Sequence, residues 1–424
     1  SSMDEKIARL CKYNFWNNNK IEIGFPRRYY TEKIKYYLNT KLVKVLVGQR
    51  RVGKSYILRQ IANQLIISGT APENIFLINK EFTDFNFISN YIDLDDIVKK
   101  YKNELKPKGK IYLFIDEIQM IEGWEKFVNS YSQNYSEDYE IFITGSNSQM
   151  LSGELATLLS GRYVKFEIFP YSYSEYIELT GKQKSKQSYI EYMEHGGLPE
   201  LFFLPNEEAK TNYISALKDT ILLRDIIQRY NIKDAKLLED LFIFLVNNAS
   251  NLISITNIVN YFLSKKRKTS YDTISNFIEY LEQAYLIHKT DRYNIKGKDT
   301  ISGACKYYTN DVSYRKYLYP GFEYGLGYKL ENMVYLELRR EGYKVYVGSM
   351  RDKEIDFVAI KGDKVIYLQC CYLLTDENVI NREYKPLEAI KDNYDKYVVS
   401  MDDIKYPSKE GIEHVQAWDL TNVI

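Results

Sequence analysis

The stretch from Lys41 to Ser55, K-L-V-K-V-L-V-G-Q-R-R-V-G-K-S, joins a short apolar run to a glycine-bounded loop. The apolar run, Val43 to Val47, has the length of a buried strand. The loop, Gly48 to Ser55, has the pattern G-x-x-x-x-G-K-S, and a helix-compatible run, Tyr56 to Leu65, follows it. In this context backbone N–H groups can turn toward an anion, and the helix N-terminus adds the positive end of its dipole. The stretch therefore predicts binding of a nucleoside triphosphate.

The residue types in this loop fit the parts needed for phosphoryl transfer. Lys54 would reach the β- and γ-phosphates, and Ser55 would hold Mg²⁺. The other positions expected around the phosphates are Gly48, Gln49, Arg50, Arg51, Val52, Gly53 and Tyr56. The expected ligands are ATP and Mg²⁺.

The composition is that of an ordinary globular protein, with 45% hydrophobic and 27% charged residues. A net charge of +1 means that any nucleic-acid binding must come from local basic patches. No two of the four cysteines form a C-x-x-C pair, so we expect thiols in a reducing compartment. The N-terminus has no long apolar core, and the longest apolar run, Leu241 to Val246, is too short for a membrane span. We expect a cytoplasmic protein.

Strand-like and helix-like segments alternate after the loop. The predicted strands are Asn74 to Asn79, Ile111 to Asp116, Glu140 to Thr144 and Tyr163 to Ile168. The predicted helices between them are Asp93 to Leu105, Gly123 to Ser130 and Gln149 to Leu159. This alternation predicts an α/β fold with a doubly wound parallel sheet.

Two further strand ends carry polar residues that fit a triphosphate site. The run I-Y-L-F-I-D-E ends in Asp116, suited to Mg²⁺, and Glu117, suited to polarising an attacking water. The alternative interpretation of this pair is a solvated acidic turn after a buried strand. The strand that ends at Thr144 is followed by Ser146 and Asn147, either of which could face the γ-phosphate. Parallel strands deliver their carboxyl ends to one edge of a sheet, so these groups should lie together.

These motifs, together with Ser160-Gly161-Arg162, resemble the prokaryotic AAA-type ATPases of the ASCE division of P-loop proteins. Within that division the chain resembles members with a C-terminal restriction-endonuclease-like domain of unknown function. The resemblance implies strand order 5-1-4-3-2, a γ-phosphate sensor in T-G-S-N and a phosphate-facing arginine. Arg162 is the candidate arginine, acting in its own subunit or, in a homo-oligomer, in a neighbour. Alternatively, Arg162 caps a helix or pairs with a nearby acid.

The same resemblance, together with three predicted helices and a strand hairpin (Leu286 to Asp291 and Lys306 to Thr309) that predict a winged helix, divides the chain into four domains. They are an ATPase core at residues 1–168, a helical lid at 169–235, a winged helix-turn-helix at 236–310 and a nuclease-like domain at 311–424. In the lid, His195 to Pro199 is expected to form a structural turn. In the winged helix, Lys265 to Lys268 is basic and Thr269-Ser270 caps the third helix. Residues 265–282 could contact DNA, or this module could pack against protein surfaces.

The last domain resembles PD-(D/E)xK nucleases in its order of elements. We expect a helix at Glu331 to Arg340, strands at Lys344 to Gly348, Glu354 to Ile360 and Lys364 to Leu373, a helix at Pro386 to Tyr394, and a strand at Lys396 to Ser400. By this resemblance Glu331, Asp356 and Gln369 occupy the metal-binding positions. Cys371 stands where those enzymes have a lysine, and a neutral thiol cannot stabilise charge as an ammonium does. We therefore expect an inactive or altered nuclease fold that contacts nucleic acid or protein.

The combined prediction is an ATP-hydrolysing AAA-type protein. Its nucleotide state would be coupled to the winged helix and the nuclease-like domain, with DNA or a protein as partner. One alternative is a nucleotide-gated binding switch with negligible turnover. The other is an ATP-dependent, metal-dependent nuclease.

Overall fold

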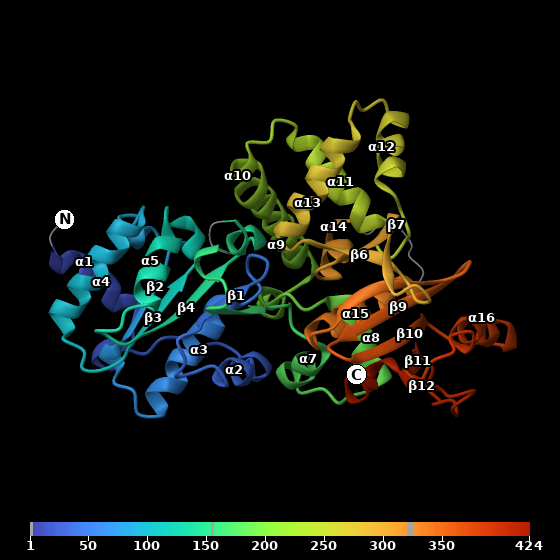
Figure 1. Ribbon diagram of the computed structural model, residues 1–424, viewed down its shortest axis with the longest axis horizontal. Helices are drawn as coiled ribbons and strands as arrows, with labels where there is room; N and C mark the ends of the chain where they lie inside the picture. The colour runs from blue at the N-terminus through green and yellow to red at the C-terminus, as the bar shows by residue number, and fades with distance from the viewer. Residues whose placement is uncertain (1–2, 154–156, 320–325) are drawn as a thin grey trace. The chain divides into compact units, whose positions relative to one another are not determined.

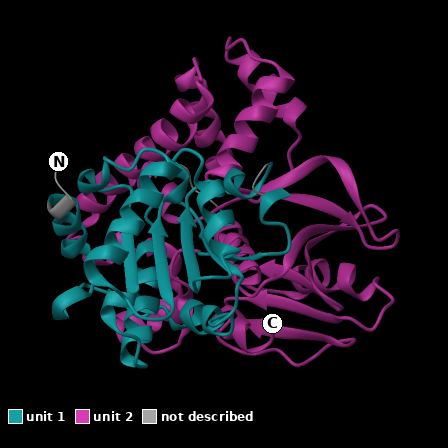
Figure 2. Ribbon diagram, turned by 60° about the vertical axis from the view of Figure 1, so that its left-hand side comes forward, with its two compact units in different colours: residues 1–168 teal, residues 169–424 magenta. Residues whose placement is uncertain are grey.

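The computed structural model describes residues 3–153, 157–319 and 326–424 (Figure 1). The chain forms two compact units, residues 1–168 and 169–424 (Figure 2). Each unit contains its own sheet and its own hydrophobic core. No helix in the described ranges is long and apolar enough to cross a membrane.

The first unit is built on a five-stranded sheet whose neighbouring strands all run parallel. Its strands are β1 (Val43–Val47), β2 (Ile75–Asn79), β3 (Ile111–Asp116), β4 (Tyr139–Gly145) and β5 (Tyr163–Glu167). Their order, β2-β3-β4-β1-β5, confirms the expected order 5-1-4-3-2. Every residue of β1 to β4 is buried, which explains why these strands are continuous apolar runs in the sequence.

Helices cover both faces of this sheet (Figure 1). They are α1 (Met3–Tyr13), α2 (Arg28–Lys35), α3 (Lys54–Ile67), α4 (Tyr91–Leu105) and α5 (Trp124–Ser132). On one face, Ile34 of α2 and Ile57 of α3 share a core cluster with Phe114 of β3. On the other face, the ring of Tyr101 from α4 lies 5.2 Å from that of Phe76 in β2, centroid to centroid. The helix predicted at Gln149 to Leu159 falls partly outside the described residues; a 3-10 helix spans Ser148–Leu151.

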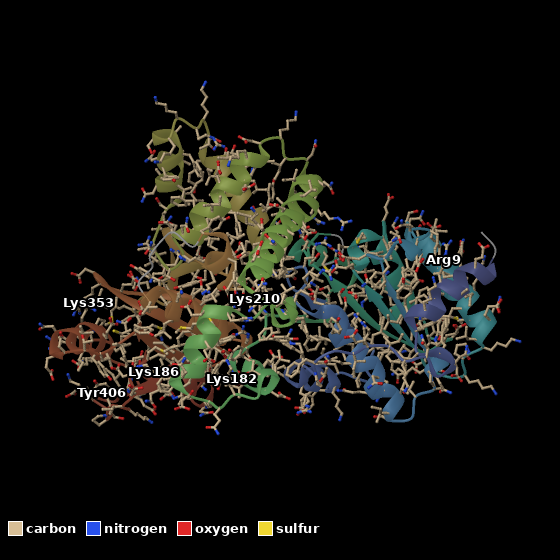
Figure 3. The ribbon with its side chains drawn as sticks, turned by 180° about the vertical axis from the view of Figure 1, so that it is seen from behind. Arg9, Lys182, Lys186, Lys210, Lys353 and Tyr406 are labelled. Atoms are coloured by element: carbon tan, nitrogen blue, oxygen red, sulfur yellow. The ribbon has the colours of Figure 1, made fainter. Side chains whose placement is uncertain are left out.

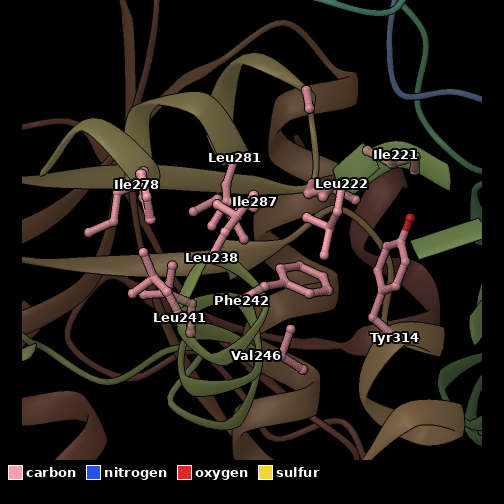
Figure 4. Packing of buried hydrophobic residues seen from close by; sticks show 14 of the residues in the cluster. Ile221, Leu222, Leu238, Leu241, Phe242, Val246, Ile278, Leu281, Ile287 and Tyr314 are labelled. Carbon is pink, nitrogen blue, oxygen red and sulfur yellow. The ribbon is translucent and has the colours of Figure 1, made fainter. Parts of the chain in front are cut away.

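The second unit begins with a run of helices. They are α7 (Tyr173–Thr180), α8 (Lys186–His195), α9 (Glu207–Thr220), a π-helix (Ile221–Ile227), α10 (Gln228–Tyr230), α11 (Ala235–Asn247), α12 (Ile255–Ser264) and α13 (Tyr271–Gln283). Ser270 caps α13, as expected, by accepting a hydrogen bond from the N–H of Thr273. Leu241 of α11 and Leu281 of α13 pack in one core with Ile287 of β6 (Figure 4).

A seven-stranded sheet forms the rest of the second unit, in the order β12-β11-β10-β9-β8-β6-β7. Its strands are β6 (Ile287–Asn294), β7 (Asp299–Thr309), β8 (Lys344–Met350), β9 (Lys353–Lys361), β10 (Lys364–Cys371), β11 (Asp395–Ser400) and β12 (Ile412–Gln416). The hairpin β6–β7 was expected as a wing. In the structure β6 also pairs in parallel with β8, from Arg292 opposite Val347 to Asn294 opposite Ser349. One sheet therefore contains both the hairpin and the C-terminal strands.

The helices of the C-terminal region are α14 (Ser313–Leu318), α15 (Leu326–Arg340) and α16 (Glu377–Glu388). The prediction of a helix from Pro386 to Tyr394 was wrong, because α16 ends at Glu388. Asp376 sets the true start by accepting a hydrogen bond from the N–H of Val379. Pro386 falls in the last turn, where it removes a single helical hydrogen bond.

Candidate functional site

The three predicted strand ends of the first unit meet at one edge of its sheet. Strands β3, β4 and β1 are neighbours and run parallel, so their carboxyl ends lie side by side. These ends carry Asp116 and Glu117, Ser146, and the loop from Gly48 to Ser55. The loop, the carboxylates and the sensor candidate are therefore brought together in space.

The loop that follows β1 leads into α3, which begins at Lys54. Gly48 lies against Ile168, the residue that follows β5: a Cβ at Gly48 would stand 2.5 Å from the carbonyl oxygen of Ile168, so no side chain fits. The Lys54 side chain is buried, and its ammonium donates to the carbonyl oxygens of Gly48 and Gln49, both at 2.8 Å. A positive charge is thus held against the loop backbone where a phosphate would bind.

Asp116 is fully buried at the end of β3 and hydrogen-bonded on two sides. Its carboxyl group contacts the Ser55 hydroxyl and accepts a hydrogen bond from the Thr144 hydroxyl. Burial, with the neighbouring Glu117 charge, raises the pKa of Asp116, although both hydrogen bonds oppose this shift. Oxygen donors of this kind suit Mg²⁺, and Ser55 and Asp116 are the residues that would hold it.

Glu117 adopts a left-handed backbone conformation, with φ of 56°. Its N–H donates to the Thr144 hydroxyl oxygen at 2.8 Å, which ties down this unfavourable conformation. Its carboxylate accepts hydrogen bonds from the Ser146 hydroxyl at 3.1 Å and from the Gln119 amide. The same carboxylate lies 3.9 Å from the Lys54 ammonium, so the proposed base and the phosphate-binding cation face each other.

The two sensor candidates have different surroundings. Ser146 contacts Glu117, whereas the Asn147 side-chain oxygen accepts a hydrogen bond from the N–H of Gln149 at 2.8 Å and caps the next helical turn. Thr144 and Gln119 also belong to the site but were not singled out from the sequence. The signal for Thr144 was present, since a polar residue at the end of a buried strand next to Asp116 requires a partner.

Two of the remaining loop residues, Arg50 and Val52, contact other parts of the first unit. Arg50 forms an ion pair with Glu81, and Arg51 is exposed, with φ of 68°. The buried guanidinium of Arg27 donates to the carbonyl oxygen of Val52 at 2.9 Å. The Arg27 N–H donates to the Gln60 side chain of α3 at 3.0 Å. Arg27, just before α2, therefore holds both the loop, through the Val52 carbonyl, and α3, through Gln60.

Arg162 lies at the opposite edge of the sheet from the loop. Its carbonyl oxygen accepts a hydrogen bond from the N–H of Val43, at the start of β1. β1 separates this point from Gly48 by about 16 Å at the usual rise of a strand. The Arg162 guanidinium donates to Asn129 at 2.9 Å and to the carbonyl of Leu158. These contacts match the alternative in which Arg162 caps a helix. They also keep Arg162 away from a nucleotide bound in its own unit. A role for Arg162 in a neighbouring copy stays a prediction.

A second polar cluster joins the predicted nuclease-like residues in the second unit. The Asp356 carboxyl is hydrogen-bonded to Glu331 of α15 and accepts from the N–H of Cys370 at 2.8 Å. The N–H of Asp356 donates to the Gln369 side chain at 2.8 Å. The Tyr308 hydroxyl of β7 donates to Glu331 at 2.9 Å. The three residues named from the sequence are therefore together.

Lys306 of β7 places an ammonium inside this cluster. It lies 2.6 Å from Glu354, 3.5 Å from Glu331 and 3.9 Å from Asp356. Burial lowers the pKa of Lys306, but the carboxylates outweigh this and raise it above its usual value. Cys371 stands at the motif position, and burial raises the pKa of its thiol to about 11, so it is neutral.

The cluster opens into a cavity of about 900 Å³, lined among others by Glu331, Asp356, Gln369 and Glu383. Among the described residues, no group of three or more His, Cys, Asp or Glu side chains is arranged to hold a metal ion. Mg²⁺ would have to be held by Glu331 and Asp356 with water, a donor set that this ion accepts.

Comparison with known proteins finds a family model that matches most of the first unit. Residues 40–177 match the family model of an AAA domain, and residues 186–324 match that of a domain of unknown function, DUF8612. An uncharacterized protein of Haemophilus influenzae is 36% identical over 401 residues, covering 93% of this chain and 97% of that protein. An uncharacterized protein of Methanocaldococcus jannaschii is 33% identical over 426 residues, covering 96% and 91%. The solved Walker-type ATPase PABY2304 of Pyrococcus abyssi matches 69% of this chain and 95% of that one, with 15% identity and a TM-score of 0.47.

Proposed function

The chain belongs to the same family as these two relatives and contains an AAA domain. From this premise we propose that it binds and hydrolyses ATP. One observation carries the proposal: the Glu117 carboxylate is held by Ser146 and Gln119 and faces the Lys54 ammonium. A merely solvated acidic turn would not be buried and fixed in this way.

The chain's own residues can perform each part of the hydrolysis. The Lys54 ammonium would exchange the carbonyl oxygens of Gly48 and Gln49 for the β- and γ-phosphates. Glu117 would orient a water for in-line attack on the γ-phosphorus and accept its proton, as the bond from that phosphorus to ADP breaks. Ser146 would sense the γ-phosphate through its contact with Glu117. Mg²⁺ bound by Ser55 and Asp116 would offset phosphate charge.

The test replaces the proposed base without changing its size. Glu117→Gln should keep Mg-ATP binding within a few-fold and lower steady-state turnover by about a hundredfold or more, because an amide cannot accept the proton. The matched control is Glu122→Gln, at an exposed acid a few residues away. Unchanged turnover in Glu117→Gln would refute the assignment. Tight binding with only background hydrolysis by the natural chain would instead establish the nucleotide-gated switch.

We also propose that the nucleotide bound to the first unit changes the affinity of the second unit for nucleic acid. On the predicted DNA-contacting segment, Lys265, Lys266 and Lys268 are exposed. Arg267 is instead paired with Asp240 of α11, so it is engaged within the unit. Ser270 is engaged in capping α13. The segment 265–282 thus offers a smaller basic surface than its sequence suggests.

A second candidate function, metal-dependent cleavage of phosphodiesters, is favoured by Lys306. Its ammonium lies among Glu331, Glu354 and Asp356 and would supply the charge that Cys371 does not. Water would attack the phosphorus and one P–O ester bond would break, leaving a phosphate monoester and an alcohol. Mg²⁺ held by Glu331 and Asp356 would offset charge on the phosphate.

This second candidate has its own test. Nicking of supercoiled DNA with Mg²⁺ or Mn²⁺ should be lost in Asp356→Ala and in Lys306→Met, and regained when Cys371→Lys is added to Lys306→Met. Mn²⁺ binding, followed by calorimetry, should weaken in Asp356→Ala. The control is Lys289→Met, at an exposed lysine on β6 of the same hairpin. Nicking that persists in Asp356→Ala would exclude this site as its source.

A further inference from the structure

The chain passes from the first unit to the second at two consecutive residues, and each of them is held by its own unit. Ile168 ends the first unit, and its N–H donates to the carbonyl oxygen of Val47, the last residue of β1, at 2.7 Å. Its own carbonyl oxygen lies so close to Gly48 that a Cβ there would stand 2.5 Å away. The Ile168 side chain is buried in the core of the first unit. The junction therefore begins in direct contact with the first glycine of the proposed phosphate-binding loop.

Phe169 begins the second unit and is held by the C-terminal end of α15. Its side chain is buried in a core cluster of that unit. The guanidinium carbons of Arg339 and Arg340 lie 5.7 and 5.9 Å from the centre of its ring, within the range of a cation–π attraction. Arg340 also donates to the carbonyl oxygens of the next two residues, Pro170 at 3.1 Å and Tyr171 at 3.4 Å. One helix end thus holds three consecutive residues of the incoming chain.

The glycine pair in the motif His195 to Pro199 holds the same segment. Gly197 accepts a hydrogen bond from the N–H of Tyr171 at 2.7 Å, and a Cβ at Gly197 would stand 2.3 Å from the Tyr171 carbonyl oxygen. The Tyr192 hydroxyl donates to that carbonyl oxygen at 2.6 Å. Gly197 is itself fixed, because its N–H donates to the buried Asp311 carboxylate at 2.8 Å. A glycine is required at this position because the incoming chain lies directly against it.

The junction is stiff as well as anchored. A single peptide bond joins Ile168 to Phe169. Pro170 follows, and a proline fixes its own φ and restricts the backbone of the residue before it. A flexible Gly/Ser linker would absorb a displacement of either end. This junction has no such residues, so a displacement of Ile168 is passed on to Phe169.

ATP binding would act on one end of the junction. The Lys54 ammonium donates to the Gly48 carbonyl oxygen at 2.8 Å and would leave it to bind the phosphates. Since Gly48 touches Ile168, a change in its backbone reaches the junction. At the other end, α15 carries Glu331 of the carboxylate cluster. Glu331 and Arg340 are about 14 Å apart along the axis of this helix.

We propose that Ile168 to Tyr171 form a stiff connection through which the nucleotide state of the first unit changes the conformation of α15. The proposal rests on the proposed binding of ATP and names the route by which its effect reaches the second unit. α15 is the receiving element, because Arg340 holds two consecutive carbonyl oxygens of the connection. A displacement of this helix also displaces Glu331, so the carboxylate cluster responds to the nucleotide.

Hydrogen–deuterium exchange of the full chain, followed by mass spectrometry, measures the response of α15. A non-hydrolysable ATP analogue with Mg²⁺ should change amide exchange in peptides covering the C-terminal half of α15 by about fivefold or more. Inserting Gly-Ser-Gly between Ile168 and Phe169 makes the connection flexible without replacing any residue. The insertion should abolish the response of α15. The Kd of the analogue and the exchange response of the loop from Gly48 to Ser55 should stay unchanged.

The control places the same insertion after Gly181, in the turn between α7 and α8 beside Lys182 (Figure 3). A Cβ at Gly181 would meet nothing within 4 Å, so this turn has room for it, and the response of α15 should survive. If the junction insertion prevents folding, Phe169→Leu takes its place. This variant removes the ring that faces Arg339 and Arg340 and should reduce the response by about threefold or more.

The proposal fails if α15 responds in the folded junction variant as it does in the natural chain, because the signal would then bypass the junction. It also fails if the natural chain binds the analogue and α15 does not respond. Calorimetry measures binding of the analogue separately. A natural chain that does not bind it would refute the proposed ATP binding and, with it, this route.

Discussion

Thr144 contacts both carboxylates of the proposed ATPase site, Asp116 and Glu117. Its hydroxyl donates to Asp116 and accepts from the N–H of Glu117 at 2.8 Å. Thr144→Val keeps the shape but leaves that buried N–H unpaired and Asp116 with one partner fewer. We expect turnover to fall about tenfold or more and the free energy of unfolding to fall by about 1–3 kcal/mol.

Steady-state ATPase rates and urea unfolding would measure these two losses. Thr144→Ser keeps the hydroxyl and should retain most of the activity, so it is the matched control. Equal turnover in Thr144→Val and the natural chain would show that Glu117 needs no such support.

At this scale, spacing alone predicted Lys54, Ser55, Asp116 and Glu117, because each stands at a fixed position in a strand–loop pattern. The choice between Ser146 and Asn147 as the γ-phosphate sensor also required the contacts of the folded strands. Thr144 and Ser146 are two positions apart, and alternate residues of a strand share a face, so the contact of Thr144 with Asp116 favours Ser146. That contact depends on the pairing of β3 with β4, which the family resemblance implied through the strand order but which the spacing of residues does not show by itself.

The turn that ends α8 shows how an element depends on one backbone position. Gly196 has φ of 82°, and a Cβ there would stand 2.4 Å from the buried Asp311 carboxylate. That carboxylate accepts a hydrogen bond from the N–H of Gly197 at 2.8 Å, so it cannot easily move. Gly196→Ala should lower the free energy of unfolding by about 3 kcal/mol or more, from strain and the clash together.

Gly181, the C-cap of α7, separates the two contributions. Its φ is 70°, but a Cβ there would meet nothing within 4 Å. Gly181→Ala should therefore cost only the conformational strain, about 1–2 kcal/mol. Urea unfolding measures the free energy of unfolding of both variants. Equal losses would mean that the Asp311 carboxylate moves to make room for the added Cβ in Gly196→Ala.

Among the elements, buried parallel strands were the easiest to predict, because both of their faces are apolar. β12 was not predicted, because its sequence contains polar residues. It reads I-E-H-V-Q, and its fully buried His414 is satisfied by a 2.7 Å hydrogen bond to Ser400. A polar residue that is paired inside the protein looks like a surface residue in the sequence. For α16 the sequence predicted a start at Pro386, whereas the Asp376 side chain caps the helix ten residues earlier.

At the scale of the whole molecule, the cluster around Lys306 could not be predicted from motif spacing. Lys306 is 25 positions before Glu331 and belongs to a hairpin assigned to a different module. It reaches the carboxylates because β6 and β7 continue the sheet of β8 and β9. In the proposed nuclease function, Lys306 would supply from another strand the ammonium that the local motif lacks at Cys371. Only the pairing of distant strands reveals it.

If nucleotide binding by the first unit and nucleic-acid binding by the second unit are coupled, each ligand must change the affinity of the other by the same factor. We expect a non-hydrolysable ATP analogue with Mg²⁺ to change the Kd for an oligonucleotide by about 5- to 150-fold, the usual range of such coupling. The oligonucleotide should then change the Kd of the analogue by the same factor.

Anisotropy titrations in both directions measure this factor, and their agreement tests the linkage itself. Lys54→Ala removes the phosphate-binding ammonium and should abolish the effect of the analogue while leaving oligonucleotide affinity unchanged, because the two sites belong to different units. Equal oligonucleotide affinity with and without the analogue would mean that the two units bind their ligands independently. ATP hydrolysis would then have to act on the second unit through a state other than the ATP-bound one.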